Sequence, residues 1–557
     1  MASPLANAAI RFHSSAVTGG PKLMGLQAAN EGFIRAFARH AEADTIHCLV
    51  EDRAHVEHFA KIVRSQRPDA KIRAAHQRMP AALADPGCVS WLDPTIARMA
   101  WRRRGVGARA FSLCGLTHTV SSGGTMENLG QLLTAPLQPW DALVCTSDAV
   151  RRAVEALLTQ TAEYLKQRFA AAAAAPMPEL VTIPLGVDCD ALKRDGAARA
   201  KFRRQLGIAD NDVAVLFVGR LSYHAKANPA PMYLALERAA KNAKAKLHLI
   251  QAGWFANKEI EKGFRDGARA MMPSVAAHFL DGREAGVRAG VWSAGDIFCS
   301  LSDNVQETFG LAPVEAMAAG LPGVVSDWNG YKDTVRDGAD GFRVPTIMSA
   351  PGSGEDLADR MFAGIETYDR FIGAASHAIA VDIDAAAAAL EKLVGDADMR
   401  RRFGDEAQAR ARAVFDWRVV IRRHQELWGE LAERRRAAPE WPGATTAPGM
   451  AANPQAIDPF AMFANYPSDT LTAKHRVALA EGGAAAVPAL LTRQLSNYCA
   501  GDLPTPAEAA AMAGRLAKGL ASVEELVKLF PAERRAVAER AVVWLMKHGA
   551  VRIAKPG

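Results

Sequence analysis

The chain has few cysteines and no long apolar run. Its seven cysteines are scattered over 557 residues, and none belongs to a Cys-x-x-Cys pair. This spacing indicates neither a disulfide framework nor a zinc site, so we expect buried, reduced thiols. No run approaches the about 18 apolar residues that a membrane-spanning helix needs, and no charged-then-apolar signal segment opens the chain. We therefore expect a cytoplasmic protein, and peripheral contact with a membrane is left open.

An excess of charge of one sign is also nearly absent. The net charge is +7, and charged residues make up 23% of the chain against 49% for the apolar set. This composition is ordinary for a soluble globular enzyme. The mild basic excess would suit phosphate-bearing ligands or an anionic membrane surface, but it identifies neither. A chain of this length is too long for one core, so two large domains with additions are expected.

Strand and helix signals alternate from residue 8 to about residue 435, which favours parallel sheets with covering helices. A first series begins with a strand near 8–17, and a second begins with the apolar strand Val213 to Gly219. The expected domains are a first α/β domain at 1–190 and a second at 191–398, then closing helices at 399–436, a flexible linker at 437–459 and a helical accessory domain at 460–557.

The most informative segment covers residues 300–327. Its pattern is an apolar strand, a polar loop, a short helix from near Gly310 to Gly320, and a second buried strand. Glu307 lies in the loop, and Glu315 lies eight residues later on the helix. A loop-to-helix junction directs free backbone N–H groups and a positive dipole end at a ligand. With carboxylates beside it, the junction suits an anionic ligand that carries vicinal hydroxyls, as a nucleotide-sugar does.

A second basic element follows the strand Val213 to Gly219. Ligands of open parallel sheets bind at the carboxyl ends of the strands, where this strand delivers Gly219 and Arg220. Arg220 can hold a phosphate with two parallel N–H donors, and Lys226, six residues on, adds a mobile positive charge. Paired with the Glu307 segment, these residues predict a site for a nucleoside diphosphate.

The motifs VGRLS with a following lysine and ETFGLAPVEAMAAGLP resemble those of the family-four retaining glycosyltransferases (glycosyl transferases group 1). Shorter pieces that match in register are IPLGVD, VCTSDAVR, DGADGFRV and FDW, so the resemblance covers about residues 8 to 435. It implies an α/β chain of GT-B architecture, with two Rossmann-like domains facing a cleft, to which a small mainly helical C-terminal domain is added. The domain at 1–190 would lie on the acceptor side, and the domain at 191–398 would bind the nucleotide-sugar.

The resemblance also implies roles for individual residues. Glu307 would lie by the donor sugar hydroxyls, Glu315 would accept hydrogen bonds from the ribose, and Arg220 and Lys226 would hold the diphosphate. His118 would stand near the reacting sugar. The further donor-binding residues would be Gly19, Gly20, Gly219, Thr308, Phe309, Gly310 and Leu311. One departure is that family members usually have glycine after the lysine, whereas Lys226 precedes Ala227.

Two Asp-x-Asp motifs, at 188–190 and 382–384, have the spacing of a divalent-cation site in a different glycosyltransferase architecture. The first falls in the segment between the two sheets and the second opens an alanine-rich helix, so we expect no metal at either. Since Arg220 and Lys226 would neutralise the leaving group, neither a metal nor a cofactor is expected.

The arginine-rich stretch 96–110 leaves two interpretations open, a solvated helix end or a patch for a membrane surface or an anionic acceptor. The tail is not expected to bind nucleic acid, because residues 456–557 interleave 12 Lys/Arg with 9 Asp/Glu.

The favoured function is transfer of a sugar from a nucleotide-sugar to a glycan or glycolipid acceptor, with retention, in cell-surface polysaccharide or glycoconjugate biosynthesis. The alternatives are a nucleotide-sugar epimerase or phosphorylase on the same fold, and a non-catalytic interaction protein with a vestigial sugar site.

Overall fold

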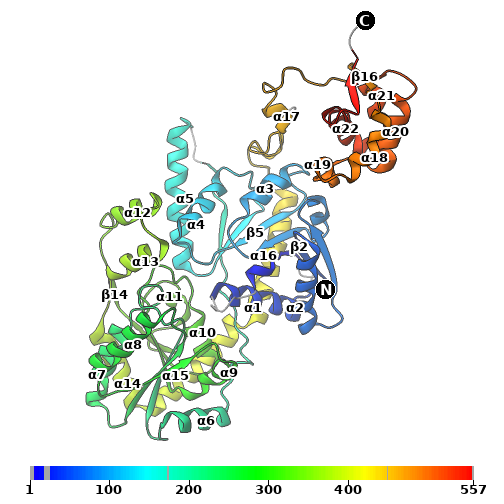
Figure 1. Ribbon diagram of the computed structural model, residues 1–557. Coiled ribbons are helices and arrows are strands. Elements are labelled where there is room, and N and C mark those ends of the chain that lie inside the picture. Colours follow the sequence, from blue (N-terminus) through cyan, green and yellow to red (C-terminus); the bar gives the residue numbers. More distant parts are fainter. Residues whose placement is uncertain (1–5, 18–24, 172–174, 448–449, 555–557) are drawn as a thin grey trace. The chain divides into compact units, whose positions relative to one another are not determined.

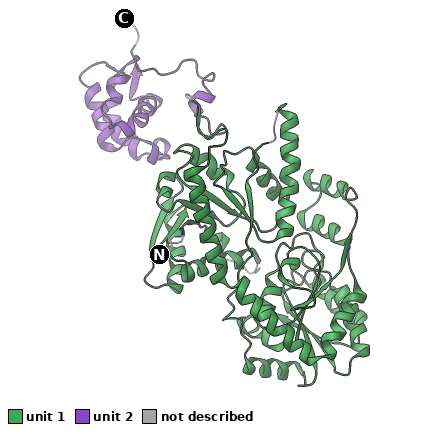
Figure 2. Cartoon of the chain, turned by 180° about the vertical axis from the view of Figure 1, so that it is seen from behind, with its two compact units in different colours: residues 1–454 green, residues 455–557 purple. Residues whose placement is uncertain are grey.

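The computed structural model describes residues 6–17, 25–171, 175–447 and 450–554. The chain divides into two compact units, residues 1–454 and 455–557, which Figure 2 colours separately. The larger unit contains two parallel sheets, each covered by helices (Figure 1).

The first domain is built on a seven-stranded parallel sheet with the strand order β3-β2-β1-β4-β5-β6-β7. Its strands are β1 (Ala9–Arg11), β2 (Thr45–Val50), β3 (Lys71–His76), β4 (Cys88–Trp91), β5 (Ser112–Leu116), β6 (Ala142–Cys145) and β7 (Glu179–Thr182). The helices are α1 (Gly25–His40), α2 (Arg53–Gln66), α3 (Ala97–Arg104), α4 (Gly123–Gly130) and α5 (Asp148–Arg168). Every residue of β4, β5 and β6 is buried, as expected for parallel strands covered on both faces.

The second domain has a six-stranded parallel sheet with the order β10-β9-β8-β11-β12-β13. Its strands are β8 (Val213–Val218), β9 (Leu247–Gly253), β10 (Ala276–Asp281), β11 (Ile297–Ser300), β12 (Gly323–Ser326) and β13 (Gly341–Val344). The covering helices are α6 (Gly196–Leu206), α7 (Ala230–Asn242), α8 (Lys258–Met271), α9 (Ala285–Ala294), α10 (Leu311–Ala318), α11 (Tyr331–Thr334) and α14 (Ile383–Gly395).

An excursion leaves the second domain between β13 and α14. It begins with β14 (Thr346–Met348), continues through α12 (Glu355–Phe362) and α13 (Tyr368–His377), and returns as β15 (Ile379–Val381). β14 and β15 form an antiparallel two-stranded sheet of their own. In Figure 1 this excursion projects from the second domain. The sequence analysis did not predict this excursion.

Two helices close the larger unit. α15 (Ala397–Arg410) runs through a short π-helical turn into α16 (Trp417–Ala437). α16 packs beside α1 of the first domain, where the His424 ring meets Phe33 at a centroid distance of 5.1 Å. A Cβ atom on Gly186 would lie 2.3 Å from the Trp417 ring, so only glycine lets the segment between the sheets pass this close to α16.

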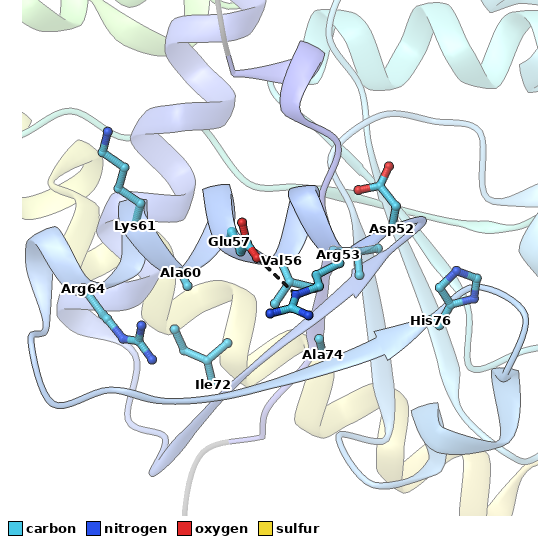
Figure 3. Close-up of a pocket in the computed structure, with 11 residues that line it drawn as sticks. Asp52, Arg53, Val56, Glu57, Ala60, Lys61, Arg64, Ile72, Ala74 and His76 are labelled. Atoms are coloured by element: carbon cyan, nitrogen blue, oxygen red, sulfur yellow. Dashed lines mark hydrogen bonds and ion pairs between the residues drawn. The ribbon is translucent and has the colours of Figure 1, made fainter.

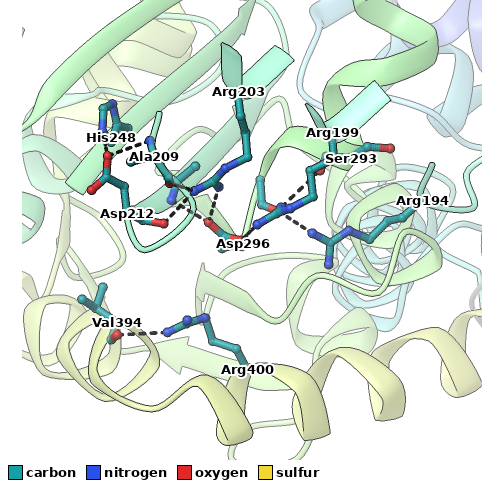
Figure 4. A network of polar contacts seen from close by, with 12 residues as sticks. Arg194, Arg199, Arg203, Ala209, Asp212, His248, Ser293, Asp296, Val394 and Arg400 are labelled. Carbon is teal, nitrogen blue, oxygen red and sulfur yellow. Dashed lines mark hydrogen bonds and ion pairs between the residues drawn. The ribbon is translucent and has the colours of Figure 1, made fainter. Parts of the chain in front are cut away.

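A buried ion-pair network fixes α6 beneath the second sheet (Figure 4). The Asp296 carboxylate accepts hydrogen bonds from Arg199 at 2.6 Å, from Arg203 at 3.0 Å and from the backbone N–H of Ala214 at 2.8 Å. Arg203 is 4% exposed. Because Ala214 lies on β8, the network joins a helix to a central strand.

The arginines of residues 96–110 differ in their burial and in their partners. Arg103 is fully buried and holds Asp141 with two bonds of 2.5 and 2.6 Å. Arg104 donates to the backbone oxygen of Ala452, and Arg109 pairs with Glu440. The sequence pattern shows the charges but not these acceptors, which come from distant segments. The prediction of a solvated helix end or a free basic patch is therefore wrong for Arg103, which is buried, whereas Arg109 remains exposed to solvent.

The smaller unit has its own core. Its helices are α17 (Pro459–Met462), α18 (Gly483–Thr492), α19 (Gln494–Asn497), α20 (Pro506–Leu516), α21 (Val523–Val527) and α22 (Arg535–Lys547), with a small antiparallel sheet of β16 (Arg476–Leu479), β17 (Ala521–Ser522) and β18 (Val551–Ile553). A capping box of Thr505 and Glu508 is present at the start of α20. The predicted class, an α/β chain with two Rossmann-like domains and a small mainly helical C-terminal domain, is confirmed. Over the described ranges, no helix is long and apolar enough to cross a membrane.

Candidate active site

The junction between β11 and α10 is built around Gly310. This residue caps α10 with a φ of +90°, a conformation that glycine adopts without strain. A Cβ atom at this position would lie 2.2 Å from the ring of Tyr331, which is fully buried. The Tyr331 hydroxyl in turn hydrogen-bonds the Ser300 hydroxyl at 2.9 Å. The turn therefore requires glycine, and its shape is fixed by a core aromatic residue beneath it.

Lys226 and Glu307 form an ion pair at this junction. Burial disfavours the charged form of both groups, but the opposite charge of the partner outweighs it. The pKa of Lys226 is therefore raised, and the pKa of Glu307 is lowered. The Thr308 N–H also donates to the Glu307 carboxylate at 3.2 Å. Lys226 and Thr308, which are both predicted to contact the donor, therefore both bind the Glu307 carboxylate.

Arg220 lies on the same side of the second sheet. Its guanidinium donates to the backbone oxygen of Ala225 at 2.8 Å and to Gln306 at 3.1 Å. Burial lowers the pKa of Arg220, while the nearby Asp369 and Tyr368 partly oppose that effect. The guanidinium carries no carboxylate ion pair among the described residues.

The loop that carries Arg220 and Lys226 is fastened to the loop before Glu307. Ser302 donates to the backbone oxygen of Lys226 at 3.3 Å, and Asn304 donates to that of His224 at 2.7 Å. The Asp303 carboxylate accepts the Asn228 N–H at 3.1 Å. The basic loop and the carboxylate loop therefore form one preassembled surface at the carboxyl ends of β8 and β11.

Two acids of this region have strongly raised pKa values. Burial raises the pKa of Glu315 to about 7, against a smaller opposing effect of Lys226. Burial likewise raises the pKa of Asp303 to about 7, although hydrogen bonds from backbone N–H groups to its carboxylate oppose the change. Perturbed acids that cluster beside a buried lysine are typical of functional sites.

The remaining predicted residues of the second domain belong to this surface. Gly219 directly follows β8 and has a φ of +153°. A Cβ atom on Gly253 would lie 2.0 Å from the Gly219 carbonyl oxygen. Phe309 is 1% exposed and its ring packs against Phe415, while Leu311 is the first residue of α10.

His118 lies in the first domain, just beyond β5. Its Nε2 atom is 3.1 Å from both the Leu92 carbonyl oxygen and the Asn30 side-chain oxygen, so this nitrogen carries the proton. Burial lowers the pKa of His118 to about 4. The imidazole is therefore neutral at pH 7 and is held in one tautomer. Gly19 and Gly20, predicted to approach the ligand, lie outside the described residues.

The two domains meet at this surface. Ser147, which follows β6, donates to the backbone oxygen of Thr308 at 2.6 Å. The N–H of Asp148 donates to Asp333 at 2.6 Å. The carboxyl ends of the strands of both sheets thus face each other. The sequence analysis missed Ser147, Tyr331 and Asp303, because only their tertiary neighbours give them a role.

Three of the four aspartates in the two Asp-x-Asp motifs form ion pairs with arginines. Asp188 pairs with Arg39, and Asp190 pairs with Arg412 and Arg418. Asp382 caps α14, and Asp384 pairs with Arg238. Within the part of the chain that the structure describes, no three His, Cys, Asp or Glu side chains are grouped as a metal site requires.

An open groove of about 700 Å³ lies elsewhere in the first domain, between α2 and β3 (Figure 3). Val56, Ala60 and Ile72 are among the apolar residues that line it, and Arg53 pairs with Glu57 along α2. None of the predicted site residues lines this groove.

Residues 198–363 match the family described as Glycosyl transferases group 1. A D-inositol 3-phosphate glycosyltransferase of Geodermatophilus obscurus is 28% identical over 237 residues, which cover 41% of this chain and 50% of the relative. A phosphatidyl-myo-inositol mannosyltransferase of Mycobacterium tuberculosis is 29% identical over 206 residues, covering 36% of this chain and 50% of the relative. The chain thus spans about half the length of these curated relatives.

Among solved structures, HepE of Anabaena in complex with UDP is similar with a TM-score of 0.47 and 16% identity, covering 76% of this chain and 100% of that one. This likeness carries no argument about the fold or the function. The segment that matches the family model contains Arg220, Lys226, Glu307 and Glu315. Over residues 198–363 the chain is therefore similar to the glycosyl transferases group 1.

Proposed function

We propose that the protein transfers a glycosyl group from a nucleotide-sugar to a hydroxyl of a glycan or lipid-linked acceptor, with retention and without a metal ion. The observation that supports this most strongly is the Lys226–Glu307 ion pair beside Arg220 at the Gly310 junction. It combines two cations for a diphosphate with a carboxylate for sugar hydroxyls, and it lies inside the segment that matches the family.

The donor diphosphate would compete with Glu307 for Lys226. When the diphosphate takes the ammonium group, the Glu307 carboxylate becomes free to accept hydrogen bonds from the sugar. In a cleft with an effective dielectric constant near 20, a unit charge at about 4 Å contributes roughly 4 kcal/mol. Only the part of this stabilisation that grows as the diphosphate departs accelerates the reaction.

In the proposed reaction, the bond between the anomeric carbon and the diphosphate oxygen breaks, and a bond to the acceptor oxygen forms on the same face of the sugar. The acceptor proton passes to the departing diphosphate, so no protein nucleophile is required. His118, being neutral at pH 7, would contribute a hydrogen bond near the reacting sugar without adding charge. Arg220 and Lys226 supply the positive charge that a metal ion would otherwise provide.

The acceptor belongs to a class that the relatives' names support, since both are named for inositol-phosphate compounds. We propose a phosphate-bearing or lipid-linked acceptor used in cell-surface polysaccharide or glycoconjugate synthesis, reached by peripheral contact with the cytoplasmic side of a membrane. Purified protein mixed with vesicles of stated anionic lipid content would test that contact by co-sedimentation.

Donor identity is found by thermal-shift measurements with UDP-, GDP- and ADP-sugars, because a ligand bound only by the folded state must raise its melting temperature. With the donor in hand, Arg220→Ala and Glu307→Ala should each reduce donor turnover at least 100-fold, on the order of an electrostatic group acting in the transition state. The matched controls are Arg269→Ala and Glu259→Ala, two exposed residues of α8. Unchanged turnover in both site variants would refute the proposal, and turnover without an acceptor alcohol would point to an epimerase instead.

A further inference from the structure

The excursion between β14 and β15 contributes little to the core of the second domain. α12 buries no side chain; its last residue, Phe362, is 57% exposed, and Ile365, just beyond the helix, is 73% exposed. α13 buries only Ile372, Gly373 and Ser376. The excursion is not needed to complete the six-stranded sheet. We therefore look for its role in its contacts with the rest of the chain.

The first of these contacts crosses to the other domain. The Tyr368 hydroxyl lies 2.8 Å from the Ser121 hydroxyl and 3.2 Å from that of Thr119. Ser121 and Thr119 are themselves 3.1 Å apart, and they follow His118 directly in the loop after β5. Ser121 is 6% exposed, so this hydroxyl cluster is largely withdrawn from solvent.

The second contact is with the basic loop of the donor site. The Asp369 carboxylate lies 3.9 Å from the His224 imidazole. A Cβ atom on Gly373 would lie 3.3 Å from the His224 Cβ atom, so the helix rests directly on this residue. His224 lies between Arg220 and Lys226, and its backbone oxygen is held by Asn304.

α13 therefore contacts two loops, one from each domain, that a transfer reaction must bring together. One end reaches the first-domain loop that carries His118, and its body rests on the second-domain loop that carries the two cations. We infer that Tyr368 is a positioning residue of the transfer reaction, whose hydroxyl holds the His118 loop in register with the donor site through Ser121 and Thr119. This inference rests on the proposed function for its reaction, but the contact itself exists without any ligand.

The inference makes a specific kinetic prediction. Tyr368 touches neither Glu307 nor Lys226 through any hydrogen bond in the described residues, so removing its hydroxyl should leave donor binding intact. What is lost is the relative placement of the two half-sites, and small errors of placement slow a reaction strongly. In Tyr368→Phe we expect kcat for transfer to fall about tenfold while the donor KM stays within a factor of two.

A double-mutant cycle separates positioning from general loosening of the structure. Ser121→Ala should reduce kcat by a similar factor, and the double variant Tyr368→Phe/Ser121→Ala should be no slower than the slower single variant. Tyr164→Phe, an exposed tyrosine of α5, is the matched control and should behave as the wild type. Multiplying effects in the double variant, or a rise of the donor KM in step with the fall of kcat, would overturn the inference.

Hydrogen exchange measures how the Tyr368 contact stabilises the two segments, and it needs no substrate. In Tyr368→Phe, peptides covering residues 117–122 and 368–377 should exchange several-fold faster than in Tyr164→Phe, and peptides of β8 and β11 should not change. Identical exchange in both variants would overturn the inference. A wild-type chain that turns over no nucleotide-sugar would sink the proposed function, while the exchange result would still decide whether the hydroxyl contact joins the two domains.

Discussion

At the scale of single residues, the candidate site depends on positions where one atom decides the geometry. Gly310 is the clearest of them, because its positive φ and the adjacent Tyr331 ring each exclude a side chain. Lys226 and Glu307 neutralise each other, which allows two charged groups to remain buried at the Gly310 junction. Their neighbours then set how strongly each one binds its proton.

Gly310→Ala should destabilise the fold and weaken donor binding together. The substitution forces an alanine into a left-handed conformation and drives its methyl group into Tyr331, so we expect a loss of more than about 2 kcal/mol. Gly207→Ala is the matched control, since Gly207 has a φ of +64° but no atom within 4 Å of the added Cβ. Urea unfolding of both variants measures the difference, and equal losses would contradict the role given to Tyr331.

Glu315 should make donor binding depend on pH. Its folded-state pKa of about 7 lies above the ordinary value, so the carboxyl group is protonated below pH 7 in the free protein. If the ionised form accepts the ribose hydrogen bonds, affinity is present above pH 7 and falls about tenfold between pH 8 and pH 6. Titration calorimetry with the intact nucleotide-sugar checks this, because the phosphates of that donor do not titrate in the window. Glu315→Gln should bind more weakly at pH 8 and show a flat profile; a profile unchanged from the wild type would be inconsistent with this role.

At the scale of elements, much of the second domain follows from local sequence. The apolar stretch that begins at Val213 is a buried strand, and the helix expected from Gly310 to Gly320 is α10, bounded by those two glycines. Turn glycines and alternating apolar runs are local signals, so they can be read without the tertiary structure.

Elements defined by their partners could not be predicted in this way. The strands β14 and β15 are only three residues long, too short for a distinct periodicity, and the role of Tyr368 depends on Ser121 in another domain. The same holds for the arginines of residues 96–110, whose acceptors lie as far along the chain as Ala452. Roles that depend on long-range contacts require the folded structure.

The α6 network of Figure 4 should be a strong contribution to the stability of the second domain. Asp296→Ala would leave Arg203 buried without its carboxylate, which typically costs about 3–5 kcal/mol. Asp266→Ala removes an exposed carboxylate that pairs with Lys262 and Arg269 on α8, and it should cost no more than about 1 kcal/mol. Chemical denaturation of the two variants compares them directly. A small loss for Asp296→Ala would mean that the network is not coupled to the strand.

At the scale of the whole molecule, the candidate site belongs to one unit only. Every described residue of the site lies within residues 1–454, and residues 455–557 have a separate hydrophobic core that includes Val477, Met512 and Leu545.

A chain ending at residue 454 should keep the donor site. We expect its donor-induced rise in melting temperature to equal that of the full chain, since the unit has its own cores and site contacts. Transfer to the natural acceptor is the activity that could change, if the smaller unit recruits that acceptor. Loss of the donor-induced shift in the shortened chain would show that the division into independent units is wrong.

The central claim is that Arg220, Lys226 and Glu307 together form a diphosphate-sugar site, and titration calorimetry of nucleotide binding tests it most directly. For the nucleotide that the thermal-shift screen selects, Arg220→Ala should raise Kd at least tenfold relative to the wild type, with Arg269→Ala unchanged. Equal Kd values for the wild type and Arg220→Ala, or no binding of any nucleoside diphosphate by the wild type, would contradict the account.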